Sequence, residues 1–240
     1  MKTEQVLETY DEAYAKAYDE TFLIDIHSQI KTACELKILM NILSEKGKAV
    51  QWLDVACGTG YVLSQFPEVE RTGFDLSPAM LKIARSKNPD IKLIEGDFRN
   101  KSLIDKGQWD VISSMWWAYS FVESISEIEQ LIENISDWLT DDGVCFMPIC
   151  EPAKNLYNGE IKIPYVAVEN APVYGGKILV TAVLWSWIEA SGKRHDNMLV
   201  PQIEYMVDIF ATYFEFVEVL EYADGYYRAI LARKKKYKFD

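Results

Sequence analysis

The fold is decided by one stretch of the sequence, Leu53-Asp54-Val55-Ala56-Cys57-Gly58-Thr59-Gly60. The apolar residues over 49–56 predict a buried strand that ends in a tight turn, and the spacing over 62–66 predicts a helix after it. Glycine at positions 58 and 60 allows backbone angles that are closed to bulkier residues. The turn would therefore present backbone N–H groups beside a helix N-terminus, where a carboxylate or a phosphate binds well.

A Gly-x-Gly turn alone is weak evidence for any particular ligand. Leu63 stands where a dinucleotide-binding fingerprint has its third glycine. The sequence Gly-Lys-Ser/Thr does not follow the turn either, which argues against a phosphate-binding P-loop.

Strands and helices continue to alternate after this turn. The alternation predicts a parallel sheet with both faces covered. Right-handed crossovers then place the carboxyl ends of the strands, and the ligand, along one edge. The predicted strands are 71–76, 91–94, 109–115 and 143–149, the last introduced by the turn Asp141-Asp142-Gly143, and the predicted helices begin at Ser77-Pro78 and span 128–139.

The two ends of the chain follow other patterns. Apolar residues at helical spacing predict helices over the first 46 residues. After Glu151 the pattern changes to short strands with turn residues such as Gly175-Gly176 and Ser191-Gly192, which predicts an antiparallel β cap above the ligand edge. Cap strands are predicted at 161–163, 165–168 and 177–188, followed by a helix that Pro201 opens and two strands near 216–222 and 226–233.

We therefore expect one domain with four parts. They are an N-terminal helical segment (1–46), a ligand-binding core (47–150), the β cap (151–200) and a C-terminal helix with the last two strands (201–240).

The composition excludes several classes of partner. The chain has 25 Lys and Arg against 37 Asp and Glu, a formal net charge of −12, which disfavours nucleic acids and anionic membranes. No stretch approaches the ~18 apolar residues of a membrane span, and the N-terminus does not resemble a signal peptide. The four cysteines, Cys34, Cys57, Cys145 and Cys150, form no Cys-x-x-Cys pair, which predicts buried, reduced thiols in a cytoplasmic protein.

Two acidic residues follow the next predicted strands. Asp75 lies in Gly73-Phe74-Asp75-Leu76-Ser77, where its carboxylate can accept both hydroxyls of a ribose. Asp97 lies in Glu95-Gly96-Asp97-Phe98, where it can accept from an exocyclic amine. Each acid alone is more often a turn or cap residue. Three such features in order, each at a strand end, favour a nucleoside ligand.

The order of these residues resembles that of class I S-adenosylmethionine (SAM) dependent methyltransferases, over roughly residues 10–149. More narrowly, it is similar to the deoxyaminosugar N-methyltransferases, a group in which an N-terminal Tyr-Asp-x-x-Tyr also occurs, here Tyr10-Asp11-Glu12-Ala13-Tyr14. The resemblance implies an α/β fold, a Rossmann-like doubly wound sheet of seven strands with the last one antiparallel. It also implies SAM as cofactor and S-adenosylhomocysteine (SAH) as product.

The resemblance further implies which residues meet the cofactor. The backbones of Ala56 and Gly58 would contact its methionine end, Asp75 would hold the ribose, and Asp97 would bind the adenine amine. Leu76 and Phe98 would flank the base, and the N-terminal tyrosines would close over the cofactor, although tyrosines at this spacing more often pack a helix. The full predicted set is Tyr14, Tyr18, Asp54, Ala56, Gly58, Gly60, Asp75, Leu76, Met80, Asp97, Phe98 and Met115.

Aromatic residues after the fourth predicted strand are candidates for binding the methyl acceptor. Trp116, Trp117 and Tyr119 could stack on a ring or sugar face, or attract a cationic amine. At least one tryptophan is expected to pack beneath the cap instead. The Asn/Asp-Pro-Pro-aromatic pattern of enzymes that methylate amino groups in nucleic acids is missing, since the chain has Ser113-Ser114-Met115-Trp116.

Methyl transfer is an in-line displacement that depends mainly on positioning, and an amine or hydroxyl acceptor must also lose a proton. The candidate catalytic residues are Glu151, Tyr14 and His195. Glu151 is about equally well explained as a turn residue before Pro152, and His195 better as part of a polar turn. No set of residues suits a catalytic metal ion.

The sequence thus predicts a SAM-dependent methyltransferase that acts on an amine or hydroxyl of a small metabolite, for which a nucleotide-linked sugar is a candidate. Two alternatives stay open: a non-catalytic SAM-binding partner or sensor, and a transferase of the aminopropyl type. Strands of the cap could also pair across a homodimer.

Overall fold

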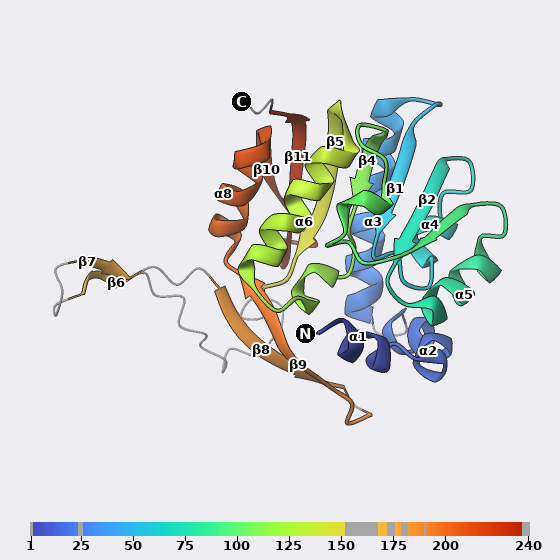
Figure 1. Cartoon of the computed structure of the whole chain (residues 1–240), viewed down its shortest axis with the longest axis horizontal. Helices are drawn as coiled ribbons and strands as arrows, with labels where there is room; N and C mark the ends of the chain where they lie inside the picture. Colours follow the sequence, from blue (N-terminus) through green and yellow to red (C-terminus); the bar gives the residue numbers. More distant parts are fainter. Residues whose placement is uncertain are drawn as a thin grey trace.

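The computed structural model describes residues 2–23, 26–151, 168–171, 176–178, 182–189 and 191–236. A seven-stranded sheet in the order β10-β11-β5-β4-β1-β2-β3 forms its centre (Figure 1). Neighbouring strands in the part β5-β4-β1-β2-β3 pair in parallel. In contrast, β11 is antiparallel to both of its neighbours, β5 and β10. This confirms the predicted fold class. The strands are β1 (Gln51–Val55), β2 (Glu70–Asp75), β3 (Lys92–Glu95), β4 (Trp109–Ser113), β5 (Leu139–Ile149), β10 (Phe214–Tyr222) and β11 (Tyr227–Lys235).

Helices cover both faces of the sheet. In Figure 1, α6 and α8 lie in front of it and α3 behind it, while α1 and α2 lie near its lower end. The α-helices are α1 (Thr3–Thr9), α2 (Glu12–Leu23), α3 (Ile26–Lys46), α4 (Tyr61–Ser64), α5 (Pro78–Lys87), α6 (Ile125–Trp138) and α8 (Ile203–Tyr213), with 3-10 turns η1 (Lys101–Leu103) and η2 (Ala118–Phe121).

Alternate side chains of the strands build two separate cores. In β1, Trp52 packs on the side of Leu39 and Leu43 from α3, whereas Leu53 packs on the side of Ile128 from α6. Successive side chains of a strand point to opposite faces, so a strand that is covered on both sides is apolar throughout. Asp54 is the one acidic residue of β1 and is therefore buried, which is unusual for a carboxylate.

Local sequence explains where two of the helices begin and end. Ser77 caps α5, because its hydroxyl accepts a hydrogen bond from the Met80 N–H at 3.2 Å, and Pro78 is the first helical residue, as predicted. The helix after the glycine turn is shorter than predicted and ends at Ser64. Pro67 is a sufficient cause, since the residue before a proline avoids the helical conformation.

The predicted turn Asp141-Asp142-Gly143 lies inside a strand. β5 is bounded by Leu139 and Ile149, and its pairing with β4 shifts near its start. Trp109 pairs with Leu139, but Val111 already pairs with Val144, so the extra residues form an irregularity in the ladder. A Cβ added at Gly143 would lie only 2.8 Å from the Leu139 Cβ, so the chain folds back on itself over 139–143, where the turn is predicted.

The predicted β cap is only partly described. Its described strands are antiparallel, as expected, but they form two separate two-stranded sheets. The predicted strand 177–188 is divided between these sheets, while 161–163 and 165–167 lie outside the described residues. Pro201 ends a strand rather than opening a helix, and Gln202 stands at the N-cap of α8. The strands are β6 (Val168–Ala171), β7 (Gly176–Ile178), β8 (Ala182–Ile188) and β9 (Arg194–Pro201).

The cysteines agree with the predicted reduced state. Cys57, Cys145 and Cys150 are buried and free, and Cys34 is free and half-buried. Among the described residues, no helix is both long and apolar enough to cross a membrane.

Replacing Gly60 with alanine is expected to destabilise the fold by about 2–4 kcal/mol, because strain and crowding add up there. Gly60 has φ +69°, and an added Cβ would lie 2.8 Å from Asn88 Nδ2 and 2.9 Å from Ala84 Cβ of α5. Gly58 is a matched control, since its φ is +54° and an added Cβ would meet nothing within 4 Å. Urea denaturation of Gly60→Ala and Gly58→Ala measures the difference, and equal losses would contradict the crowding.

Candidate functional site

A cavity lies at the carboxyl ends of β1 to β4. It holds about 780 Å³ of empty space, its open mouth included, and apolar side chains make up most of its lining. A second hollow of about 430 Å³ adjoins it, shares the Ala56–Gly58 turn and adds Asp54. The predicted cofactor residues that line the larger cavity are Tyr18, Ala56, Gly58, Asp75, Leu76, Met80, Asp97, Phe98 and Met115.

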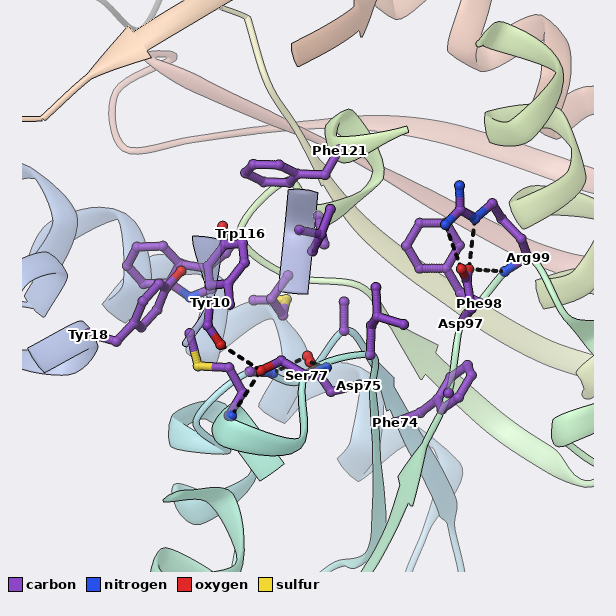
Figure 2. Close-up of a pocket in the computed structure, with 18 residues that line it drawn as sticks. Tyr10, Tyr18, Phe74, Asp75, Ser77, Asp97, Phe98, Arg99, Trp116 and Phe121 are labelled. Carbon is purple, nitrogen blue, oxygen red and sulfur yellow. Dashed lines mark hydrogen bonds and ion pairs between the residues drawn. The ribbon is translucent and has the colours of Figure 1, made fainter. Parts of the chain in front are cut away.

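The Asp75 carboxylate forms the floor of this cavity (Figure 2). One oxygen accepts from the Gly58 N–H at 2.7 Å and the other from the Ser77 N–H at 2.8 Å. Burial raises the pKa of Asp75, and these backbone hydrogen bonds oppose the shift. Because a carboxylate offers about four lone-pair sites, both oxygens can still accept from ligand hydroxyls.

The Asp97 carboxylate lies on another side of the cavity and is paired with Arg99. Arg99 donates to it from its backbone N at 2.9 Å, from Nε at 2.8 Å and from Nη2 at 2.5 Å. Burial alone would raise the pKa of Asp97, but the hydrogen bonds and charge of Arg99 outweigh it and hold the pKa below its usual value. Arg99 was not predicted as a site residue, although its position two residues after Asp97 could have suggested the pair.

Aromatic rings form the opposite wall of the cavity. Tyr10, Tyr18, Trp116 and Phe121 line it, and Figure 2 shows them away from the side on which Asp97 and Phe98 lie. The ring of Tyr10 lies 6.2 Å from that of Tyr18 and 5.8 Å from that of Phe121. Of the tyrosines expected to close over the cofactor, the structure thus places Tyr18 on the wall.

Tyr14 instead points to the β8–β9 hairpin. Its hydroxyl donates to Glu189 Oε1, and the same oxygen lies 2.7 Å from His195 Nε2. The ring of His195 stacks on Trp187 at 5.1 Å. His195 is only 1% exposed, so it does not lie in a polar turn. We call Tyr14, Glu189 and His195 the acid–imidazole cluster.

The protonation states in this cluster follow from its contacts. Burial raises the pKa of Tyr14 and its hydrogen bond to Glu189 raises it further, so the phenol stays a donor. Burial also acts to raise the pKa of Glu189, but hydrogen bonds from Tyr14, His195 and Ser191 outweigh it, and the pKa lies below its usual value. His195 Nδ1 is buried with no hydrogen-bond partner within the described residues.

The cluster lies directly behind the cavity wall. The ring of His195 is 6.4 Å from Tyr10 and 6.2 Å from Phe121, and both of these rings line the cavity. Glu189 was not predicted from the sequence; its position just before the Ser191-Gly192 turn and His195 was the available signal.

The other predicted residues lie elsewhere. Tyr119 is in the core, where its hydroxyl accepts from the Cys150 N–H at 2.7 Å, and Trp117 packs against the same core. Glu151 is engaged with Arg228, whose Nε donates to it at 2.8 Å. Gly60 packs against α5 rather than lining the cavity.

Asp54 is expected to make the stability of the protein depend on pH. Burial raises its pKa to about 7, although Ser113 donates to it at 2.6 Å. Between about pH 4 and pH 7 the folded state then holds a proton at Asp54 that the unfolded state has lost, so this group's contribution to stability falls as the pH rises. Urea denaturation at several pH values measures the free energy of unfolding. Between about pH 4 and pH 7 this free energy should fall less steeply with pH in Asp54→Asn than in the wild type. The same slope in both proteins would contradict the raised pKa of Asp54.

Comparison with known proteins shows what this architecture is. Residues 53–143 match the family model described as a methyltransferase domain. Over these residues the chain is similar to that family. The matched segment holds the glycine turn, Asp75 and Asp97, so the domain assignment and the sheet agree with the resemblance drawn from the sequence.

Curated relatives of the methyltransferase domain match over part of their length. The chain is 36% identical over 101 residues to dTDP-3-amino-3,6-dideoxy-alpha-D-glucopyranose N,N-dimethyltransferase of Streptomyces fradiae, which covers 40% of this chain and 38% of that protein. It is 42% identical over 72 residues to demethylmenaquinone methyltransferase of Chlorobaculum tepidum, 29% of either chain. The chain thus spans well under half the length of these two relatives.

Among solved structures, DesVI of Streptomyces venezuelae superposes with a TM-score of 0.66 at 21% identity. The superposition covers 92% of this chain and 98% of DesVI, so the likeness in fold extends beyond the matched domain.

Proposed function

We propose that the protein is a SAM-dependent methyltransferase that methylates an amine of a small metabolite. The cavity at the carboxyl ends of β1 to β4 is the observation that carries this proposal. There, Asp75 joins the glycine turn to the start of α5, and apolar side chains surround it. A ribose on Asp75 would place an adenine toward Phe98 and the methionine moiety toward the Ala56–Gly58 turn.

The second hollow suits the methionine end of the cofactor. It begins at the Ala56–Gly58 turn, and Asp54 and Asp19, whose carboxylate is also paired with Lys87, are among its lining residues. Asp19 accepts a hydrogen bond from the Thr59 hydroxyl at 2.5 Å, which ties α2 to the turn. Acidic groups at this end fit the cationic amino group of SAM.

The reaction is a displacement at the methyl carbon bound to sulfur. The acceptor nitrogen forms the new C–N bond as the C–S bond breaks, SAH leaves, and the nitrogen gives up a proton. Because the methyl group is already activated, the protein acts chiefly by alignment and exclusion of water. We assign the wall formed by Tyr10, Trp116 and Phe121 to the acceptor, with the acid–imidazole cluster behind it as the group that takes the proton.

We propose an amino sugar linked to a nucleotide as the acceptor. The Streptomyces fradiae relative is named for such a substrate, whereas the Chlorobaculum relative is named for a menaquinone precursor. The aromatic wall supports a sugar, since aromatic rings stack on the apolar faces of such rings and attract ammonium groups.

The proposal is tested by incubating the protein with labelled SAM and a panel of acceptors. The panel holds free and nucleotide-linked amino sugars, the matching hydroxy sugars and a demethylated quinone, and mass spectrometry detects the added methyl group. Methylation of an amino sugar is the expected result. SAH binding without any methyl transfer would favour a sensor, and failure to bind SAH would overturn the proposal.

We also propose that two copies associate through the β8–β9 hairpin. Leu184 and Ile188 of β8 are 63% and 54% exposed and lie on one face of the strand, and such apolar patches often mark interfaces. In sedimentation velocity, Leu184→Glu is expected to shift a dimer to monomers, while the same change at exposed Leu103 is not. A wild type that sediments as a monomer would overturn this part of the proposal.

A further inference from the structure

Two consecutive tryptophans after β4 have a backbone conformation that needs support. Trp116 has φ 57° and Trp117 has φ 62°, the left-handed region that side chains with a Cβ rarely adopt. Such residues persist only where their surroundings hold them in place. The turn contains neither glycine nor asparagine, so neighbouring side chains must provide the stabilisation.

Lys31 of α3 is the neighbour that contacts both tryptophans. Its ammonium nitrogen lies 4.7 Å from the ring centroid of Trp116 and 4.9 Å from that of Trp117. Lys31 is only 4% exposed, and a desolvated cation is attracted to an indole face more strongly than one in water. One buried charge therefore holds the two rings at once.

The charge of Lys31 is balanced within the core. Glu35, one helical turn further along α3, places Oε1 2.8 Å from Lys31 Nζ and is fully buried. The hydroxyl of Tyr222 donates to the same oxygen at 2.6 Å. The Glu35 carboxylate thus fixes the lysine from one side while the two indoles enclose it on the other.

Trp116 connects this charged group to the site. Its side chain lines both the larger cavity and the adjoining hollow, together with Met115 and the Ala56–Gly58 turn. The ring of Phe22 from α2 packs against it at 6.5 Å. A change in the Trp116–Trp117 turn would therefore alter the wall that both spaces share.

We propose that Lys31 is a positioning residue for the methyl-donor pocket: its buried ammonium holds the Trp116–Trp117 turn so that Trp116 closes the wall where the two spaces join. The inference rests on the proposed function, because it assigns these spaces to SAM. The competing explanation is that Lys31 only neutralises Glu35 inside the core.

Three variants separate these explanations: Lys31→Met, Glu35→Gln, and the double variant Lys31→Met/Glu35→Gln. Lys31→Met and the double variant should both lose about fivefold or more in SAH affinity, since both lack the ammonium. Glu35→Gln retains the ammonium and should bind SAH within about twofold of the wild type. If Lys31→Met is too unstable to purify, the double variant carries the test, because it leaves no unpaired buried carboxylate.

Near-ultraviolet circular dichroism gives a second readout that needs no ligand, since it reports how the tryptophan rings are packed. The spectrum should change in both variants without Lys31 and stay close to the wild type in Glu35→Gln. Wild-type affinity and spectrum in the double variant would overturn the role of Lys31. A wild type that does not bind SAH would instead overturn the proposed function, and the spectra would still test the positioning of the turn.

Discussion

Replacing Glu189 with glutamine is expected to lower kcat by about 100-fold or more, within the range that general acid–base groups contribute. The carboxylate that accepts from Tyr14 and lies 2.7 Å from His195 would lose its charge, so the acid–imidazole cluster could no longer hold a proton from the acceptor. SAH affinity should change by less than about twofold, because Glu189 does not line the cavity that we assign to the cofactor.

Steady-state kinetics and calorimetry together measure these two effects. Ser191→Ala is the matched control, since it leaves the Glu189 carboxylate in place and removes the 3.0 Å hydrogen bond to its other oxygen, together with the 3.3 Å bond that the Lys193 N–H donates to Ser191 Oγ. Its kcat should stay within about threefold of the wild type. If Glu189→Gln lost cofactor affinity and turnover equally, the cluster would have a structural role, and an unchanged kcat would remove it from the mechanism.

Replacing Asp75 with alanine is expected to weaken SAH binding by about 10- to 100-fold, the effect of losing hydrogen bonds to a charged group. The change removes the carboxylate that we propose as the acceptor for the ribose hydroxyls. It also frees the Gly58 and Ser77 N–H groups that the carboxylate now holds at 2.7 and 2.8 Å, so the glycine turn loses its tie to α5.

Isothermal titration calorimetry checks the effect, with Asp75→Asn as the control. The amide retains one accepting oxygen, so its loss of affinity should lie between those of the wild type and the alanine variant. Urea denaturation of the same samples separates weak binding from unfolding. Unchanged affinity in Asp75→Ala would contradict the assignment of the ribose to this carboxylate.

The sheet, and the gathering of the glycine turn and the acids at the strand ends around one cavity, could be predicted because their signals are local. A strand, a glycine turn and an acid such as Asp75 at the next strand end are read from a few adjacent residues, and parallel connections bring such ends together. The order of the strands therefore already brings Gly58, Asp75 and Asp97 to one cavity.

The acid–imidazole cluster could not be predicted in this way, since it depends on contacts between distant parts of the chain. Tyr14 and Glu189 are separated by 175 positions, and no local pattern indicates that they meet. Glu151 has the same difficulty: its place after β5 suggested a base, but Arg228 of β11 pairs with it. Tyr119 shows a third case, because its burial depends on how η2 packs and not on its neighbours in sequence.

The position of β11 has a consequence for how the polypeptide matures. This strand lies between β5 and β10, follows both of them in the sequence, and is hydrogen-bonded to both. Until residues 227–235 are synthesised, one edge of β5 has unpaired backbone N–H and C=O groups, and apolar side chains cover both faces of the strand. Other chains can pair with such an edge. Closure of the sheet thus waits for the synthesis of β11, and truncations within this strand should yield insoluble material rather than a smaller folded domain.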